Sequence, residues 1–320
     1  MLRFAISSGV VCLFALALAA QNGPNLQNSP AAPEDNFRLN VSVRLVQLPV
    51  TVTSRDGKSL DNLPQSSFQV YEDNVLQEIT LFKHEDIPIS LGLVIDNSGS
   101  MRNKRQRINS AALSFVRESN PDDQTFIVDF DEETILRQDF TGNIADLVLA
   151  LRDIHTQGET ALNDAVYVSI DHVETGTRDK KALLIVSDGE DNKSKYGINR
   201  LLDHIRDSKD VTIYAIGLLD ENDIRGGLFG KSPSKKAREN LKKIAELSGG
   251  EAYFPKSVEE VSSICIKIAR DLRNQYTLGY SPRNTKNDGG YRTIRVNVTP
   301  PLGTPKLNIR TKPGYTAPTS

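Results

Sequence analysis

The pattern of hydrophobic and polar positions changes twice along this chain. From 39 to 53 apolar and polar residues alternate, as in a strand with one buried face, and 55–58 (Arg-Asp-Gly-Lys) has the composition of a hairpin turn. Two short apolar stretches, 68–71 and 79–82, then flank a polar turn at 72–74. This first part therefore predicts antiparallel β-structure, which is too small to bury a core without a partner surface.

From residue 87 to about 270, short apolar runs alternate with amphipathic stretches. This alternation predicts an α/β fold with a doubly wound, mostly parallel sheet that is covered by helices on both faces. Because only a short polar turn (131–133) separates the strand at 125–130 from the apolar stretch at 134–140, the latter is predicted to be an antiparallel edge strand. The other predicted strands are 91–95, 181–187, 211–218 and 251–254. The predicted helices are 105–118, 144–154, 161–173, 198–208, 235–247 and a final helix whose apolar face runs from Val258 to Leu272.

Strand patterns return after residue 272, at 276–280, 292–298 and 307–310, separated by turns rich in Gly, Pro and Asn. Either β segment would expose an apolar face if it stood alone. The late strands are therefore predicted to complete the early ones into one small antiparallel β module. The alternative is two separate β appendages, which would leave both apolar faces in water.

The first residues have the pattern of an export signal. Arg3 precedes an apolar run from Val10 to Ala20, which ends in alanines and is too short for a membrane span. Removal of this segment would leave Cys265 as the only cysteine and no internal disulfide, which favours a bacterial exported protein in the periplasm, at the cell surface or outside the cell. No membrane span is expected after its removal. The predicted division is a signal peptide (1–20), a flexible leader (21–36), an N-terminal β segment (37–86), an α/β domain (87–271) and a C-terminal β segment (272–316).

The composition narrows the classes of function. The chain has 320 residues, of which 25% are charged, and a formal net charge of −2. A nearly neutral chain offers no electrostatic basis for binding nucleic acid. The four histidines do not have the spacing of zinc ligands, and neither a nucleophile motif nor a phosphate-binding loop is present. An enzyme is therefore not predicted.

The clearest chemical signal follows the first predicted parallel strand, which stops abruptly at Asp96 and is followed by Ser98 and Ser100. One carboxylate and two hydroxyl groups are hard oxygen donors of the kind that Mg²⁺ prefers, and open α/β sheets place ligands beyond the carboxyl ends of their strands. Taken alone, this pattern suits a polar turn before a helix equally well. Tracing the chain up and down the sheet, however, brings Thr160 and Asp188 to the same edge. Five donors would leave roughly one position of an octahedron open for a ligand.

These donors, in their sequence contexts, resemble the metal-ion-dependent adhesion site of von Willebrand factor type A domains: Asp96-x-Ser98-x-Ser100, Thr160 after Gly158, and Asp188 before Gly189. The resemblance covers about 87–270, and the flanking β segments are similar to exported, chiefly acidobacterial, proteins related to this domain. It implies a Rossmann-like fold and Mg²⁺ bound by the first three donors, with Mn²⁺ or Ca²⁺ as substitutes. It also implies that Thr160 and Asp188 change between direct and water-mediated contact. The expected partner is a protein that offers an acidic side chain to the metal.

Two other functions remain open at this stage. The metal could serve only to hold the loops of a structural scaffold together, or a hydrolase could use a metal-bound water, with Glu159 or Glu190 as the general base. The acidic residues at 131–133 are expected to be polar hairpin residues, with contact to a partner near the metal as the alternative. Those at 190–191 are expected to form a solvated acidic loop, with a role as additional metal ligands as the alternative. The long link at 219–234 is either a disordered insertion or a recognition loop whose apolar pair, Leu228 and Phe229, contacts the partner.

Overall fold

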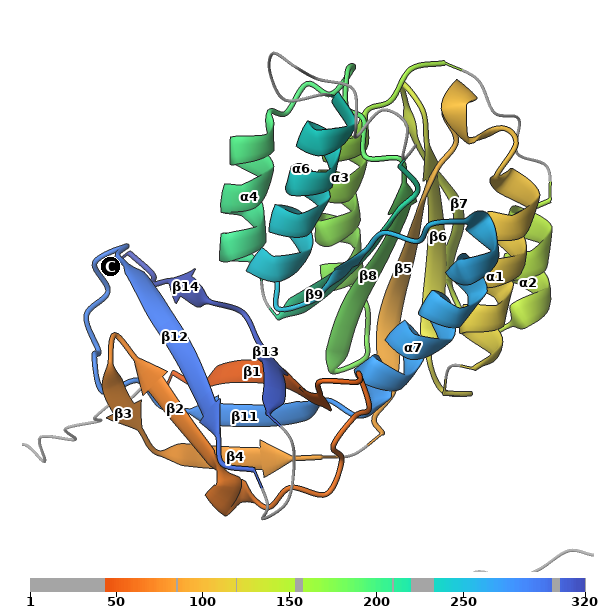
Figure 1. Ribbon diagram of the computed structural model, residues 1–320. Helices are drawn as coiled ribbons and strands as arrows, with labels where there is room; N and C mark the ends of the chain where they lie inside the picture. Colours follow the sequence, from red (N-terminus) through yellow and green to blue (C-terminus); the bar gives the residue numbers. More distant parts are fainter. Residues whose placement is uncertain are drawn as a thin grey trace, which may run out of the picture. The chain divides into compact units, whose positions relative to one another are not determined.

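The computed structural model describes residues 44–84, 86–118, 120–152, 158–208, 210–219, 233–300 and 306–319. Within these ranges the chain forms one six-stranded sheet and two four-stranded sheets (Figure 1). The predicted signal peptide and leader lie outside the described residues. None of the helices in the described ranges is both long and apolar enough to cross a membrane.

The six-stranded sheet has the order β10-β9-β8-β5-β6-β7. Its parallel strands are β5 (Ile89–Asp96), β6 (Gln124–Phe130), β8 (Lys180–Ser187), β9 (Val211–Gly217) and β10 (Ala252–Tyr253). The edge strand β7 (Thr134–Thr141) runs antiparallel to β6, as the short preceding turn predicts. From β5 the chain first builds outward to β6 and β7, and then returns to build β8 and β9 on the other side of β5. The strand order therefore reverses between β5 and β8, which is where open α/β sheets bind ligands.

Helices cover both faces of this sheet (Figure 1). One face carries α1 (Arg105–Arg117), α2 (Ile144–Ala150) and α7 (Val261–Arg273). The other face carries α3 (Leu162–Glu174), α4 (Ile198–Asp207) and α6 (Pro233–Leu247). All eight residues of β5 are buried, because successive side chains of a central strand enter one core or the other. The predicted doubly wound α/β fold is confirmed.

The two four-stranded sheets are built from both ends of the described chain, as predicted. Their orders are β13-β1-β11-β4 and β14-β12-β2-β3. The N-terminal strands are β1 (Val46–Ser54), β2 (Phe68–Glu72), β3 (Val75–Gln77) and β4 (Ile79–Lys83). The C-terminal strands are β11 (Tyr276–Tyr280), β12 (Tyr291–Val298), β13 (Leu307–Arg310) and β14 (Gly314–Thr316). Because β1 lies between two C-terminal strands and β12 pairs with β2, neither segment completes a sheet alone.

The structure corrects the predicted hairpin of the N-terminal segment. The turn at Asp73 and Asn74 joins β2 to β3, whereas β4, which was expected to follow that turn, pairs with β11 in the other sheet. Both turn residues have positive φ, 47° and 65°, so two residues suffice to reverse the chain. Three further differences are smaller. Helix α2 ends at Ala150 instead of 154, and β14 was not predicted. The strand expected at 39–53 begins at Val46 within the described residues, and 39–43 lie outside them.

Candidate metal centre

The site begins where β5 ends. Asp96 is completely buried, and its two carboxylate oxygens have different partners. Oδ1 accepts a hydrogen bond from the main-chain N–H of Ser98 at 2.9 Å, and Oδ2 accepts one from the Ser187 hydroxyl at 2.6 Å. The first of these bonds turns the chain immediately after the strand, as short acidic side chains do. Met101, fully buried at the end of the following 3-10 turn, anchors the loop in the core.

A second strand delivers Asp188 to the same place. The Ser100 hydroxyl donates to Asp188 Oδ2 at 2.5 Å, although the two residues are 88 positions apart in the sequence. The hydroxyl oxygens of Ser98 and Ser100 are 3.0 Å from one another. The structure thus joins four of the five predicted donors by hydrogen bonds. Ser100 is exposed while Ser98 and Asp188 are buried, so the cluster opens to solvent on the side of Ser100.

Thr160, the fifth predicted donor, is bound through its main chain to the loop that follows β8. Its N–H donates to Asn192 Oδ1 at 2.9 Å, and its carbonyl accepts from the N–H groups of Asn192 and Lys193 at 3.0 and 3.1 Å. The residue is 3% exposed. The loop that follows β5 also contacts the loop that precedes α3, because the Gly99 N–H donates to the Gly158 carbonyl at 3.3 Å. Three loops therefore meet here, those that follow β5 and β8 and the one that precedes α3.

The chemistry of these groups fits a hard divalent cation. Burial, together with the negative charge of Asp188, raises the pKa of Asp96 to about 6, against the lowering effect of hydrogen bonds from Ser187 and Ser98. A buried carboxylate whose pKa is raised by a neighbouring negative charge gains from a cation placed between the two. The remaining donors are neutral hydroxyl oxygens, which suit Mg²⁺. In the ranges that the structure describes, no group of three or more His, Cys, Asp or Glu side chains is placed to hold a metal, so a zinc-like set is not formed there.

Two polar residues of the cluster were not anticipated from the sequence. Ser187 donates to Asp96 and also accepts the Gly189 N–H at 2.8 Å, and Asn192 holds Thr160 in place. Ser187 could have been recognised from the sequence, because it is a hydroxyl-bearing residue at the end of an otherwise apolar strand. No local signal distinguished Asn192 from its polar neighbours.

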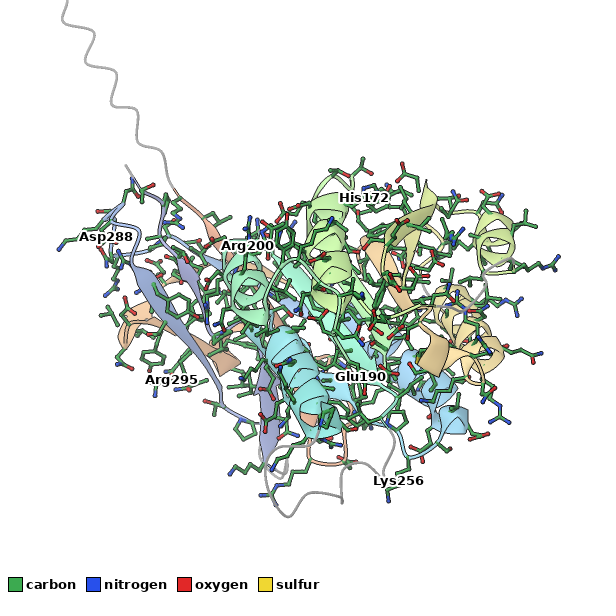
Figure 2. All side chains as sticks on the ribbon, turned by 90° about the horizontal axis from the view of Figure 1, so that it is seen from above. His172, Glu190, Arg200, Lys256, Asp288 and Arg295 are labelled. Carbon is green, nitrogen blue, oxygen red and sulfur yellow. The ribbon has the colours of Figure 1, made fainter. Side chains whose placement is uncertain are left out.

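The acidic residues around the cluster are mostly engaged. Glu159, a candidate general base, pairs with Lys193 at 2.6 Å. Glu190 is exposed in the loop after β8, which Figure 2 views from above. Asp191 was expected to be solvated, but its carboxylate accepts hydrogen bonds from the Ser194 hydroxyl at 2.5 Å and from Asn163 Nδ2 at 2.6 Å. It thereby ties this loop to the first turn of α3.

Other predicted features lie away from the cluster. Cys265 is buried in α7, and burial raises the pKa of its thiol to about 12, as expected for a core residue. The apolar pair Leu228 and Phe229 falls outside the described residues. A cavity of about 380 Å³ is found at the amino end of β8, lined in part by three lysines and three acids: Lys83, Lys180, Lys181, Glu174, Asp179 and Asp210.

Residues 91–190 match the family model for the von Willebrand factor type A domain. This range runs from β5 to the loop after β8 and contains all five predicted donors. Inter-alpha-trypsin inhibitor heavy chain H4 of Sus scrofa is 24% identical over 135 residues, which are 39% of this chain and 15% of that protein. The chain thus matches only a small part of that relative's length.

Several solved structures are distantly similar. The von Willebrand factor type A structure from Catenulispora acidiphila has 11% identity and a TM-score of 0.49, covering 88% of this chain and 75% of that chain. The pilus adhesin SpaC from Lactobacillus rhamnosus GG has 13% identity and a TM-score of 0.49, covering 81% and 49%. The vWF domain of the type V pili tip protein Mfa5 from Porphyromonas gingivalis has 15% identity and a TM-score of 0.45, covering 58% and 95%.

Proposed function

Because this chain contains a von Willebrand factor type A domain, we propose that it is an exported module that binds a protein partner in a Mg²⁺-dependent manner. Such domains typically act in protein interaction rather than in catalysis. Five residues would hold the metal: Asp96, Ser98, Ser100, Thr160 and Asp188. Mn²⁺ or Ca²⁺ would suit the same oxygen donors.

One observation carries this proposal, the hydrogen bond between Ser100 and Asp188 at 2.5 Å. It brings a hydroxyl from the loop after β5 together with a carboxylate from the loop after β8, at the reversal of strand order. A polar turn that served only its own helix would not need a partner from another strand. When bound, the metal would supply the positive charge that attracts an acidic side chain of the partner.

One of the two candidate general bases for hydrolysis is engaged in an ion pair. Glu159 is paired with Lys193 and therefore is not free to act as a general base.

Within the proposal, the chain is divided as predicted, with a signal peptide at 1–20, a leader at 21–36, the metal-binding domain at 87–271, and β segments at 37–86 and 272–316 on either side of it. The exported location and the acidic nature of the partner's contact belong to the proposal as well.

The test is Asp96→Ala, compared with the wild type and with Asp203→Ala. Asp203 lies in α4, and its side chain is 67% exposed, which makes it a matched control for the loss of one carboxylate. We expect Asp96→Ala to abolish Mg²⁺ binding in calorimetry and to leave the protein folded, with about 1–3 kcal/mol less unfolding free energy, because two buried hydrogen bonds to this carboxylate are lost. Unchanged Mg²⁺ affinity would refute the metal site. Collapse of the fold would favour the scaffold interpretation.

Partner binding can be tested with immobilised protein and an envelope extract, in Mg²⁺ and in chelator. A partner captured by the wild type and by Asp203→Ala should be released by chelator and absent from Asp96→Ala. A partner that Asp96→Ala retains would show that recognition does not depend on the metal.

A further inference from the structure

A buried arginine lies directly beneath the candidate metal centre. Arg105, the first residue of α1, is only 8% exposed. Its Nη1 donates to the main-chain carbonyl of Asp96 at 3.3 Å. Among the residues that the structure describes, its Nε and Nη2 have no hydrogen-bond partner. Burial lowers the pKa of Arg105 to about 10, so the guanidinium is still charged at neutral pH.

The nearest carboxylate below the site does not satisfy this arginine. Asp129 of β6 is 1% exposed, and its carboxylate accepts hydrogen bonds from Nε and Nη2 of Arg137 in β7 at 2.6 and 3.1 Å. The amide of Asn97 donates to the same carboxylate at 3.2 Å. Asp129 and Asp96 stabilise the charge of Arg105, whereas Arg137 opposes it. Arg105 is therefore held as a positive charge beside the metal donors, without a salt-bridge partner of its own in the described part of the chain.

The charge balance of this cluster points to a role. The charged groups linked in this cluster are four carboxylates and two guanidinium groups, which makes a net charge of minus two: Asp96, Asp129, Asp131, Asp188, Arg105 and Arg137. A divalent cation would neutralise that charge, whereas without Arg105 the loaded cluster would keep a charge of minus one and would repel an anionic ligand. Opposite charges in a site shielded from solvent interact more strongly than at the surface.

We propose that Arg105 sets the ligand preference of the site: it weakens the binding of the free cation and strengthens the binding of an anionic ligand to the loaded site. The inference rests on the proposed function, since it concerns the same metal centre. It assigns to one buried residue the selection of an acidic partner over a neutral one.

The experiment compares Arg105→Met with the wild type. Methionine fills much of the same buried space without a charge. Mn²⁺ affinity is measured from the free-ion EPR signal, and fluoroacetate affinity is measured by ¹⁹F NMR at saturating Mg²⁺. We expect Mn²⁺ to bind more tightly and fluoroacetate more weakly, each on the order of tenfold, as for charges several ångströms apart in a partly buried site. A role in structure alone would weaken both, so opposite changes support the proposal, and parallel or absent changes overturn it.

Two controls complete the design. Arg107 lies on the same helix, and its side chain is 61% exposed. Arg107→Met should therefore leave the affinities for Mn²⁺ and for fluoroacetate unchanged. Asp129→Asn removes a negative charge from the cluster and should shift both affinities in the opposite sense, with weaker Mn²⁺ and tighter fluoroacetate binding. If Arg105→Met does not fold, the proposal is tested with Asp129→Asn alone. Weaker Mn²⁺ binding together with tighter fluoroacetate binding then supports the proposal, and any other combination overturns it. A wild type that binds no Mn²⁺ would instead refute the proposed function itself.

Discussion

A single hydroxyl group orients the central carboxylate of the candidate site. Ser187 donates to Asp96 Oδ2 at 2.6 Å, while its own oxygen accepts the Gly189 N–H at 2.8 Å. It thus connects the ends of β5 and β8 and keeps Asp96 aimed at the loop cluster. Residues that hold metal ligands in this way are often as important as the ligands themselves.

Ser187→Ala should weaken Mg²⁺ binding by about tenfold, because the freed carboxylate of Asp96 can rotate away from the metal. Its cost in folding free energy should be about 1–2 kcal/mol, the price of one buried hydrogen bond and a stranded N–H. Calorimetry with Mg²⁺ and urea unfolding measure the two effects. Ser110→Ala, an exposed serine of α1, is the control and should change neither. Equal Mg²⁺ affinity in Ser187→Ala would mean that Asp96 is oriented by other contacts.

At the scale of elements, β5 is the strand on which both cores depend. It pairs with β6 on one side and with β8 on the other, and a small residue in its middle allows large side chains to meet over it. A Cβ atom at Gly92 would lie 2.3 Å from the ring of Phe126 and 2.5 Å from Leu183. These side chains belong to the core beneath α3, α4 and α6.

Gly92→Ala should therefore destabilise the protein by about 1–3 kcal/mol, since an added methyl group in a filled core forces its neighbours to shift. Chemical unfolding with the midpoint followed by circular dichroism gives the change. Gly197→Ala is the matched control: nothing lies within 4 Å of the added atom, and φ is an ordinary −71°. Its stability should fall by no more than about 1 kcal/mol, because Gly197 is the N-cap of α4 and alanine is a poorer cap. Equal effects of the two substitutions would disprove the packing argument.

At the scale of the molecule, an ion pair joins the β module to the α/β domain. Arg310 of β13 donates to Asp271 of α7 at 2.5 Å and also contacts Glu251. Asp271 is 1% exposed, and burial raises its pKa to about 6. Arg310 thus pairs directly with this buried carboxylate, and the positive charge of Lys267 also lowers the pKa of Asp271.

Arg310→Met should cost about 3 kcal/mol at pH 7, because the buried Asp271 would lose its ion-pair partner. The double variant Arg310→Met/Asp271→Leu should recover most of that loss. The pKa of Asp271 is higher in the folded protein than in the unfolded chain. Its buried negative charge therefore destabilises the folded state above that pKa, and this destabilisation decreases as the pH falls and the carboxylate is protonated. The deficit of Arg310→Met relative to the wild type should therefore shrink between pH 7 and pH 5. Urea unfolding at both pH values is the measurement, with the exposed Arg295→Met as control. A deficit that grows towards pH 5 would contradict this account.

The sequence by itself determined the α/β fold and the meeting of the candidate donors. Parallel strands joined by helices all end at one edge of their sheet, so Asp96 and Asp188 had to arrive there together, as the bond between Ser100 and Asp188 illustrates. The composite β module followed from the same kind of reasoning, because an apolar face must be covered. That these donors bind Mg²⁺ stays a prediction.

Only the tertiary structure decided which short strands pair and which charges are buried. The apolar stretch of β4 suits a hairpin as well as a place beside β11, and the choice depends on a two-residue turn and on a partner about 200 residues away. Arg105 stands among several other basic residues at the start of α1 and looks locally like any of them. It is buried because its position on the helix faces Asp96 and Asp129, and no local pattern contains that contact. Local patterns determine elements, whereas burial of a charge depends on groups that are distant in the sequence and close in space.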